Sequence, residues 1–86
     1  MYYVYILRLS NGQLYTGFTG DLRRRILEHK RGKVLSTAKR GPVELIHYEA
    51  YLLGSDARRR EKFLKGTEGK RYLQLQIRDI LSKQMK

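Results

Sequence analysis

The chain has 86 residues, which is enough for one small domain and too few for two. It has no cysteine, so neither disulfide bonds nor a thiolate zinc site stabilises it. No apolar run approaches the roughly 18 residues of a membrane span, and the N-terminus lacks the pattern of a signal peptide. These properties predict a single cytoplasmic domain over residues 1–86, held together by hydrophobic packing.

The composition is strongly basic, with 19 Lys and Arg residues, 8 Asp and Glu residues and a net charge of +11. A field of this sign concentrates polyanions, of which nucleic acid is the commonest in the cytoplasm. The charge falls in short runs within patterned segments, at residues 23–25, 30–31, 39–40 and 58–60. We therefore expect a nucleic-acid partner, with solubility alone as the plainer interpretation. A membrane surface is disfavoured because no helix pairs a basic face with a broad aromatic face.

The first two predicted elements form a β-hairpin. Residues 2–9 are β-branched, aromatic and apolar on both alternating faces, which is typical of a strand buried on both sides. Residues 10–12 (Ser-Asn-Gly) indicate a turn, and residues 14–19 form the returning strand.

The length of this turn decides where the tyrosines point. A two-residue turn would put Tyr5 and Tyr15 on opposite faces of the hairpin. A three-residue loop, with Gly12 in the left-handed conformation, pairs Leu7 with Tyr15. It also pairs Tyr5 with Gly17, so that both tyrosines share one face. We favour the three-residue loop because it separates the hydroxyl-bearing side chains from the aliphatic ones.

The next predicted element is a basic helix that Asp21 opens and Gly32 closes. At about 100° per residue, His29 falls on the apolar stripe of this helix and Arg25 at its edge, unlike their basic neighbours. From geometry alone, His29 is either a hydrogen-bonded, partly buried imidazole or a functional group. Arg25 is likewise either a functional group or an arginine whose stem packs on the core with its head in water.

A strand and two helices complete the chain. After a basic loop, the pattern predicts a third strand over residues 43–51. A second helix, capped by Ser55 or Asp56, ends before Gly66, and Thr67 starts a third. The third helix has an apolar stripe of four residues: Leu73, Ile77, Ile80 and Leu81. The order ββαβαα predicts an α+β fold with a three-stranded, mainly antiparallel sheet flanked by three helices.

Glu61 lies on the apolar stripe of the second helix, between Ala57 and Leu64. Carboxylates are seldom buried without a partner, because desolvation disfavours the charged form. We therefore expect Glu61 either to pair with an arginine, such as Arg60 or Arg25, or to bind a cation. Mg²⁺ is often held by one or two carboxylates together with waters and substrate phosphate.

Taken together, these residues resemble the GIY-YIG nuclease family, and most closely its small standalone bacterial branch. The matching segments follow the family's order: residues 3–5, residues 15–25 with His29, residues 42–45 and residues 57–62. Each short motif alone is weak evidence, whereas the ordered set with this spacing is specific. The resemblance extends from about residue 2 to residue 75 and implies an antiparallel sheet flanked by three helices.

The resemblance also implies an endonuclease that hydrolyses phosphodiester bonds in DNA, with Mg²⁺ or Mn²⁺ as cofactor, in DNA repair or processing. By this resemblance Tyr15 is the general base or the phenol that orients the attacking water. Tyr5 supports the same water network, and Gly17 leaves room for the scissile backbone beside the sheet.

Three further residues receive roles from the resemblance. Arg25 clamps the phosphate, and His29 orients the site or shares in proton transfer. Glu61 holds the metal ion. Other basic side chains are expected to make non-specific contacts with DNA phosphates: Arg24, Lys30, Arg31, Lys39 and Arg40.

Two positions depart from the family pattern and leave alternatives open. Tyr3 replaces the family's first glycine, which we expect to affect packing more than chemistry. Leu73 stands where some family nucleases carry an asparagine, and no appended DNA-binding domain is visible. One alternative is therefore a nucleic-acid-binding module with little activity alone, or one that depends on an unidentified protein partner for specificity. A purely structural alternative treats Arg25 and Glu61 as an ion pair beneath an aromatic hairpin.

Overall fold

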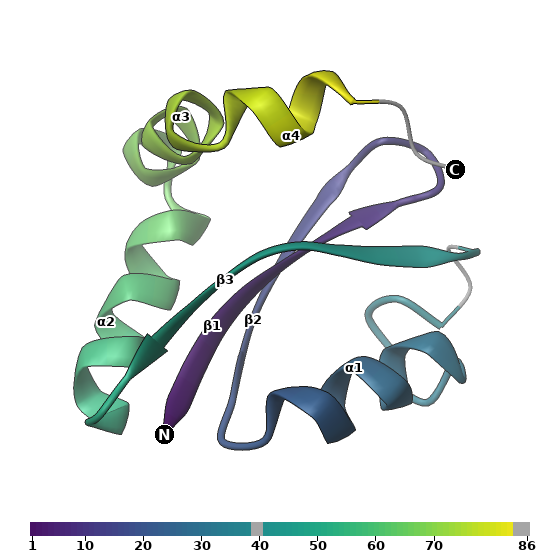
Figure 1. Cartoon of the computed structure of the whole chain (residues 1–86), viewed down its shortest axis with the longest axis horizontal. Coiled ribbons are helices and arrows are strands. Elements are labelled where there is room, and N and C mark those ends of the chain that lie inside the picture. The colour runs from purple at the N-terminus through teal and green to yellow at the C-terminus, as the bar shows by residue number, and fades with distance from the viewer. Residues whose placement is uncertain (39–40, 84–86) are drawn as a thin grey trace.

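The computed structural model describes residues 1–38 and 41–83 and contains one three-stranded antiparallel sheet (Figure 1). The strands are β1 (Tyr2–Leu9), β2 (Leu14–Thr19) and β3 (Val43–Tyr51), in the spatial order β2-β1-β3. The helices are α1 (Leu22–Lys30), α2 (Gly54–Lys65), α3 (Thr67–Gln76) and α4 (Arg78–Ser82). The predicted α+β class and antiparallel sheet are confirmed.

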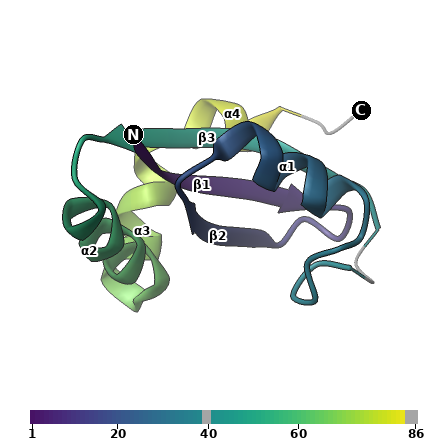
Figure 2. The same cartoon turned by 90° about the horizontal axis from the view of Figure 1, so that it is seen from below.

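The sheet separates two hydrophobic clusters, because alternate side chains of the central strand β1 point to opposite faces. On one face, Val4 and Ile6 pack against α2 and α3, chiefly Ala57, Leu64 and Leu73. On the other face, the cluster consists of Tyr5, Leu7, Leu9 and Val43, with Leu22 and Ile26 of α1 packed against it. Figure 2 shows α1 in front of the sheet, and the remaining helices lie beside and behind it.

The hairpin has the three-residue loop that the sequence favours. The ladder pairs Leu7 with Tyr15 and Tyr5 with Gly17. The Leu9 N–H donates to the Gln13 carbonyl at 2.8 Å, which closes the ladder at the loop. Gly12 has a φ of +87°, a left-handed conformation that glycine adopts without steric cost. The predicted register is therefore confirmed.

The predicted cap of the second helix is wrong. Asp21 caps α1 as expected, accepting a hydrogen bond from the Arg24 N–H at 3.1 Å. In α2, however, the N-cap is Leu53, with an extended backbone and no side-chain hydrogen bond. Asp56 lies inside the first turn, where it accepts a hydrogen bond from Arg59 at 2.8 Å and complements the positive end of the helix dipole.

The predicted third helix is two helices, because the chain leaves helical geometry at Ile77, which has φ −114° and ψ 28°. The break turns α4 away from the axis of α3 (Figure 1). Buried Arg8 donates to the carbonyls of Ile80 and Leu81 at 3.2 and 3.3 Å, so it fixes the end of α4. All four residues of the predicted stripe still pack on the cluster around Val4.

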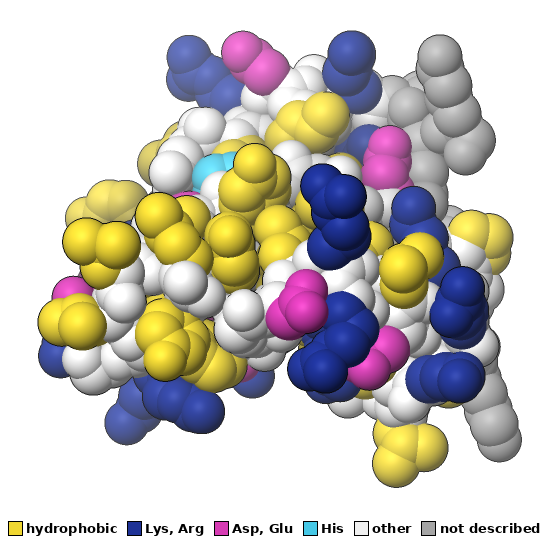
Figure 3. Space-filling model, turned by 60° about the horizontal axis from the view of Figure 1, so that its bottom comes forward, with side chains coloured by type: hydrophobic (Ala, Val, Ile, Leu, Met, Phe, Trp, Pro, Cys, Tyr) yellow, Lys and Arg dark blue, Asp and Glu magenta, His cyan; other side chains and the backbone are white. Residues whose placement is uncertain are grey.

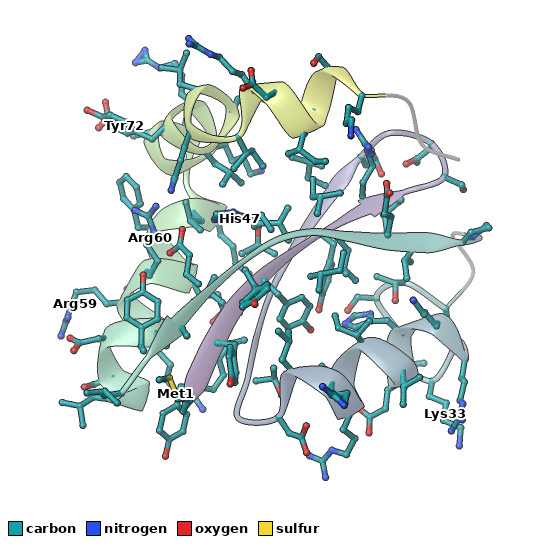
Figure 4. All side chains as sticks on the ribbon, in the orientation of Figure 1. Met1, Lys33, His47, Arg59, Arg60 and Tyr72 are labelled. Atoms are coloured by element: carbon teal, nitrogen blue, oxygen red, sulfur yellow. The ribbon has the colours of Figure 1, made fainter. Side chains whose placement is uncertain are left out.

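A polar network that the sequence does not predict joins β3 to α2, with Glu49 at its centre. Arg60 donates to both Glu49 oxygens at 2.9 and 3.2 Å, and the Tyr51 hydroxyl donates at 2.7 Å. His47 Nε2 lies 3.0 Å from the same carboxylate, and Figure 4 shows His47 and Arg60 between β3 and α2. Burial alone would raise the pKa of Glu49, but hydrogen bonds from Arg60, His47 and Tyr51 lower this pKa to about 2.

We expect this network to make stability sensitive to acid. Because the pKa of Glu49 falls from 4.5 to about 2 on folding, its contribution is complete above pH 4.5 and is lost as the pH falls towards 2. The loss amounts to about 2–3 kcal/mol of unfolding free energy. Urea unfolding across this range should show a steeper acid decline for wild type than for Glu49→Gln. A Glu68→Gln control, at an exposed site, should decline like wild type. Parallel declines for wild type and Glu49→Gln would contradict the assignment.

Candidate active site

A buried chain of hydrogen bonds runs from β1 through α1 to the loop that follows it. The Tyr5 hydroxyl lies 2.8 Å from His29 Nε2, and His29 Nδ1 lies 2.8 Å from Thr37 Oγ1. All three side chains are buried, with exposed fractions of 0% for Tyr5, 3% for His29 and 1% for Thr37. Both ring nitrogens are therefore engaged, so the imidazole cannot rotate without losing two hydrogen bonds.

Tyr15 brings a second phenol to this chain from β2. Its ring lies 5.2 Å from the imidazole of His29 and 6.3 Å from the ring of Tyr5, centroid to centroid. Unlike Tyr5, Tyr15 is only partly buried. Of these two phenols, Tyr15 is therefore the accessible one, and Tyr5 is enclosed by its neighbours.

Gly17 has a packing role that the sequence does not predict. A side chain at this buried glycine would collide with the ring and hydroxyl of Tyr5. The space where a side chain at Gly17 would lie is therefore filled by Tyr5, and the room for a DNA backbone beside Gly17 stays a prediction. Glycine is needed here so that the Tyr5 hydroxyl can reach His29.

Arg25 stands at the edge of the cluster and pairs within its own helix. Its Nη1 lies 3.1 Å from the Glu28 carboxylate, and its side chain is 37% exposed. Hydrogen bonds to the Tyr5 hydroxyl and to Glu28 raise the pKa of Arg25. The alternative ion pair between Arg25 and Glu61 does not form, since the partners are Glu28 and Lys65. The guanidinium nevertheless keeps an accessible side next to Tyr5.

Burial and the positive charge of Arg25 lower the pKa of His29 below its ordinary value. The imidazole is therefore neutral at neutral pH, with one donor and one acceptor nitrogen. Burial also raises the pKa of Tyr5, more than Arg25 lowers it. Two neutral, hydrogen-bonded groups thus form a rigid support beneath Tyr15 and Arg25.

Glu61 approaches the cluster from α2. Its charge contributes to the raised pKa of Tyr5, so it lies within electrostatic reach of that hydroxyl. The carboxylate is 19% exposed and pairs with Lys65 at 3.1 Å, so the predicted pairing with Arg60 or Arg25 is wrong. Arg60 instead binds Glu49. Glu61 pairs with Lys65 because residues four apart on one helix already lie side by side, whereas a partner on another element would have to be brought to it by packing.

The donor set fits a weakly held hard cation. In residues 1–38 and 41–83, no three His, Cys, Asp or Glu side chains lie close enough together to form a complete metal site. Mg²⁺ does not require one, since a single carboxylate, waters and substrate phosphate suffice. Glu61 offers such a carboxylate, and Lys65, which is 57% exposed, is free to swing away from it.

The structure describes three of the five residues predicted to contact DNA. Arg24, Lys30 and Arg31 are exposed on α1 and just after it. Lys39 and Arg40 lie outside the described residues. Leu73, at the position of the family's asparagine, is 2% exposed and packs in the core, so it offers no polar contact. Across the described ranges, no helix is long and apolar enough to cross a membrane.

Thr37 and Glu28 belong to the cluster but were not among the predicted site residues. The sequence does indicate a contact for Glu28, because Glu28 follows Arg25 by three residues on one helix and this spacing favours an ion pair. For Thr37 the sequence indicates only that the helix ends near Gly32, which has a φ of +70° in the structure. The loop that follows then folds back, so that Thr37 contacts His29. Sequence spacing alone does not reveal such a return.

Thr37→Val is expected to lower the unfolding free energy by about 1–3 kcal/mol, because it leaves His29 Nδ1 buried without a partner. Urea unfolding measures this loss. The ¹⁵N shifts of the His29 ring, which report its tautomer, should change as well. Thr37→Ser should restore both properties, and Ser36→Ala, at an exposed neighbour, should alter neither. An unchanged ring spectrum in Thr37→Val would contradict the positioning role.

Comparison with known proteins places this architecture in a family. The family model described as the GIY-YIG catalytic domain matches residues 1–74. A UPF0213 protein of Clostridium perfringens is 40% identical over 76 residues, which cover 87% of this chain and 82% of the relative. A UPF0213 protein of Haloquadratum walsbyi is 43% identical over 65 residues, which cover 74% and 73%.

A solved structure agrees with the fold. The solution NMR structure of the UPF0213 protein BH0048 from Bacillus halodurans matches with a TM-score of 0.54 and 39% identity. The match covers 85% of this chain and 82% of that one. Because the family model spans most of the sequence, relatives of similar extent share up to 43% of their residues with it and one solved relative has its fold, this chain belongs to the GIY-YIG nuclease family.

Proposed function

We propose that this single domain is a divalent-metal-dependent endonuclease that hydrolyses phosphodiester bonds in DNA, in cytoplasmic DNA repair or processing. The observation that carries the proposal is the gathering of Tyr15, Arg25 and His29 on one face of the hairpin. Family membership supports the nuclease class. The net charge of +11 supports a polyanionic substrate.

The accessible residues supply the chemistry. Arg25 pairs with a non-bridging oxygen of the scissile phosphate and stabilises the charge that grows there in the transition state. The Tyr15 hydroxyl oxygen orients the attacking water opposite the leaving oxygen. A divalent cation, Mg²⁺ or Mn²⁺, held by Glu61 supplies positive charge beside the leaving oxygen when it is bound.

The buried residues hold the accessible ones in place. His29, fixed by Thr37, keeps the Tyr5 hydroxyl beside Arg25 and supports the ring of Tyr15. Tyr5 is thus a positioning residue, because it is fully buried. A rigid support of this kind reduces the reorganisation needed at the reacting phosphate.

Nicking of supercoiled plasmid tests the proposal. Wild-type protein should convert supercoiled to open-circular DNA with Mg²⁺ or Mn²⁺ and stop when EDTA is added. Branched and flapped oligonucleotides then test the form of DNA preferred. A Glu61→Gln preparation purified in parallel controls for contaminating nucleases. Cleavage at equal rates in EDTA, or by both preparations, would refute the proposal.

The second candidate is a DNA-binding module of the same fold with little activity alone. The burial of Leu73 favours it, because the core takes up the position where some family nucleases carry a polar residue. A protein that shifts DNA in a gel but never nicks it, in either metal, would support this candidate. Activity restored by adding a cell extract would indicate a partner that supplies specificity.

A further inference from the structure

A hollow of about 560 Å³ lies between α1 and β3 and has an aromatic and a basic side. Tyr3 and Tyr48 line it from the sheet, with ring centroids 6.2 Å apart and planes at 63°. Arg23 and Lys30 line it from α1, next to the N-cap carboxylate of Asp21, which accepts a hydrogen bond from the Arg24 N–H. Figure 3 shows this face, with hydrophobic side chains on one half and Lys and Arg side chains over the half where α1 lies.

The hollow is not needed for the core. Tyr48 is 54% exposed, and Leu27 on the opposite wall is 46% exposed, so neither completes the buried cluster. An exposed aromatic ring offers a surface on which any nucleobase can stack, and nearby cations neutralise the adjoining phosphates. In a paired duplex the bases are stacked inside, so only an unpaired nucleotide presents its face to Tyr48.

The hollow lies next to the candidate active site. Tyr48 is the ladder partner of Tyr5, and Tyr3 precedes Tyr5 by two residues on the same face. On α1, Arg25 faces one flank, whereas Arg23 and Lys30 face the other, as expected at 100° per residue. A helix is about 10 Å across and stacked nucleotides are about 3.4 Å apart, so the two flanks are on the order of three nucleotides apart.

We propose that the hollow lined by Tyr3, Tyr48 and Lys30 binds an unpaired nucleobase of the DNA substrate, about three nucleotides from the scissile phosphate. The position relative to the cut rests on the proposed function; the binding itself does not. The preferred substrate is then DNA with a single-stranded segment beside the cleavage point, such as a flap or a gap. A fully paired duplex engages only the basic residues.

Binding in EDTA tests the proposal without cleavage. Fluorescence anisotropy at fixed salt compares Tyr48→Ala with wild type on a labelled single strand and on a blunt duplex. The variant should bind the single strand about 5- to 150-fold more weakly and the duplex unchanged, because one stacking contact is lost. Tyr48→Phe should bind like wild type, since it keeps the ring.

Matched controls separate stacking from charge and from general surface effects. Tyr72→Ala removes a tyrosine that is 60% exposed on the far side of the molecule from α1 (Figure 4) and should change neither affinity. Lys30→Ala should lower the affinity for the single strand and for the duplex by the same factor. A set of strands with one abasic site each should identify the engaged nucleotide, and on that strand Tyr48→Ala should bind like wild type.

The outcomes distinguish this proposal from the proposed function. Equal affinities of wild type and Tyr48→Ala for single strands overturn the base-binding hollow, even if plasmid nicking persists. Self-association that Tyr48→Ala abolishes, with unchanged DNA binding, overturns it in favour of a contact between copies of the chain. Single-strand binding that depends on Tyr48, in a protein that never nicks DNA, supports the hollow and refutes the nuclease.

Discussion

Glu61→Gln is expected to lower the rate of plasmid nicking by about 10²–10³-fold, because the amide loses the charge that attracts the metal. The carboxylate is 19% exposed and its ion pair with Lys65 is a surface pair, so unfolding free energy should change by less than about 1 kcal/mol. Initial nicking rates and urea unfolding measure the two effects.

Two variants serve as controls for Glu61→Gln. Lys65→Met keeps the carboxylate but removes its partner, so it should retain nicking and bind Mn²⁺ at least as tightly as wild type. Glu68→Gln removes an exposed charge on α3 and should leave both properties unchanged. Binding of Mn²⁺, followed by electron paramagnetic resonance, gives a readout that does not depend on cleavage. Equal Mn²⁺ affinities in wild type and Glu61→Gln would exclude Glu61 as the ligand.

Tyr15→Phe is expected to reduce nicking by about 10²–10⁴-fold, the usual effect of losing a group that moves or orients a proton. Phenylalanine keeps the ring contacts with Tyr5 and His29, so stability should change by less than about 0.5 kcal/mol. Binding of DNA in EDTA should also persist. The loss should therefore appear in the rate at saturating DNA and not in affinity.

Tyr72→Phe is the matched control, because Tyr72 is exposed on α3 and lies far from the cluster. It should nick DNA at the wild-type rate. If Tyr15→Phe does so too, the hydroxyl takes no part in the reaction, and the cluster around His29 is only a structural support.

The hairpin and its face could be predicted because they depend on local rules. A strand alternates its faces every residue, and a left-handed Gly12 selects the loop length. Helical periodicity likewise placed His29 and Arg25 towards the sheet. The positions of side chains in the cluster around His29 could therefore be predicted where a single strand or helix fixes the direction of the side chain.

Partners and boundaries that depend on several elements were not predictable. Arg25 and Glu61 have long side chains, and each forms its ion pair with a neighbour on its own helix. The break at Ile77 precedes a short helix whose last carbonyls bind Arg8, which is remote in sequence. Thr37 reaches His29 only because an irregular loop returns to the helix. None of these follows from a periodic pattern.

The three-residue loop also constrains how this hairpin can vary over evolutionary time. Substitutions at its exposed residues Ser10 and Asn11 do not shift the register, although Asn11 Oδ1 accepts a hydrogen bond from the Gln13 N–H at 3.0 Å. Losing or gaining one residue, in contrast, would slip β2 and turn Tyr15 to the opposite face. Such an indel would remove Tyr15 from His29 without touching either residue. Among descendants that keep the activity, we expect Gly12 to persist and the loop to vary hardly at all in length.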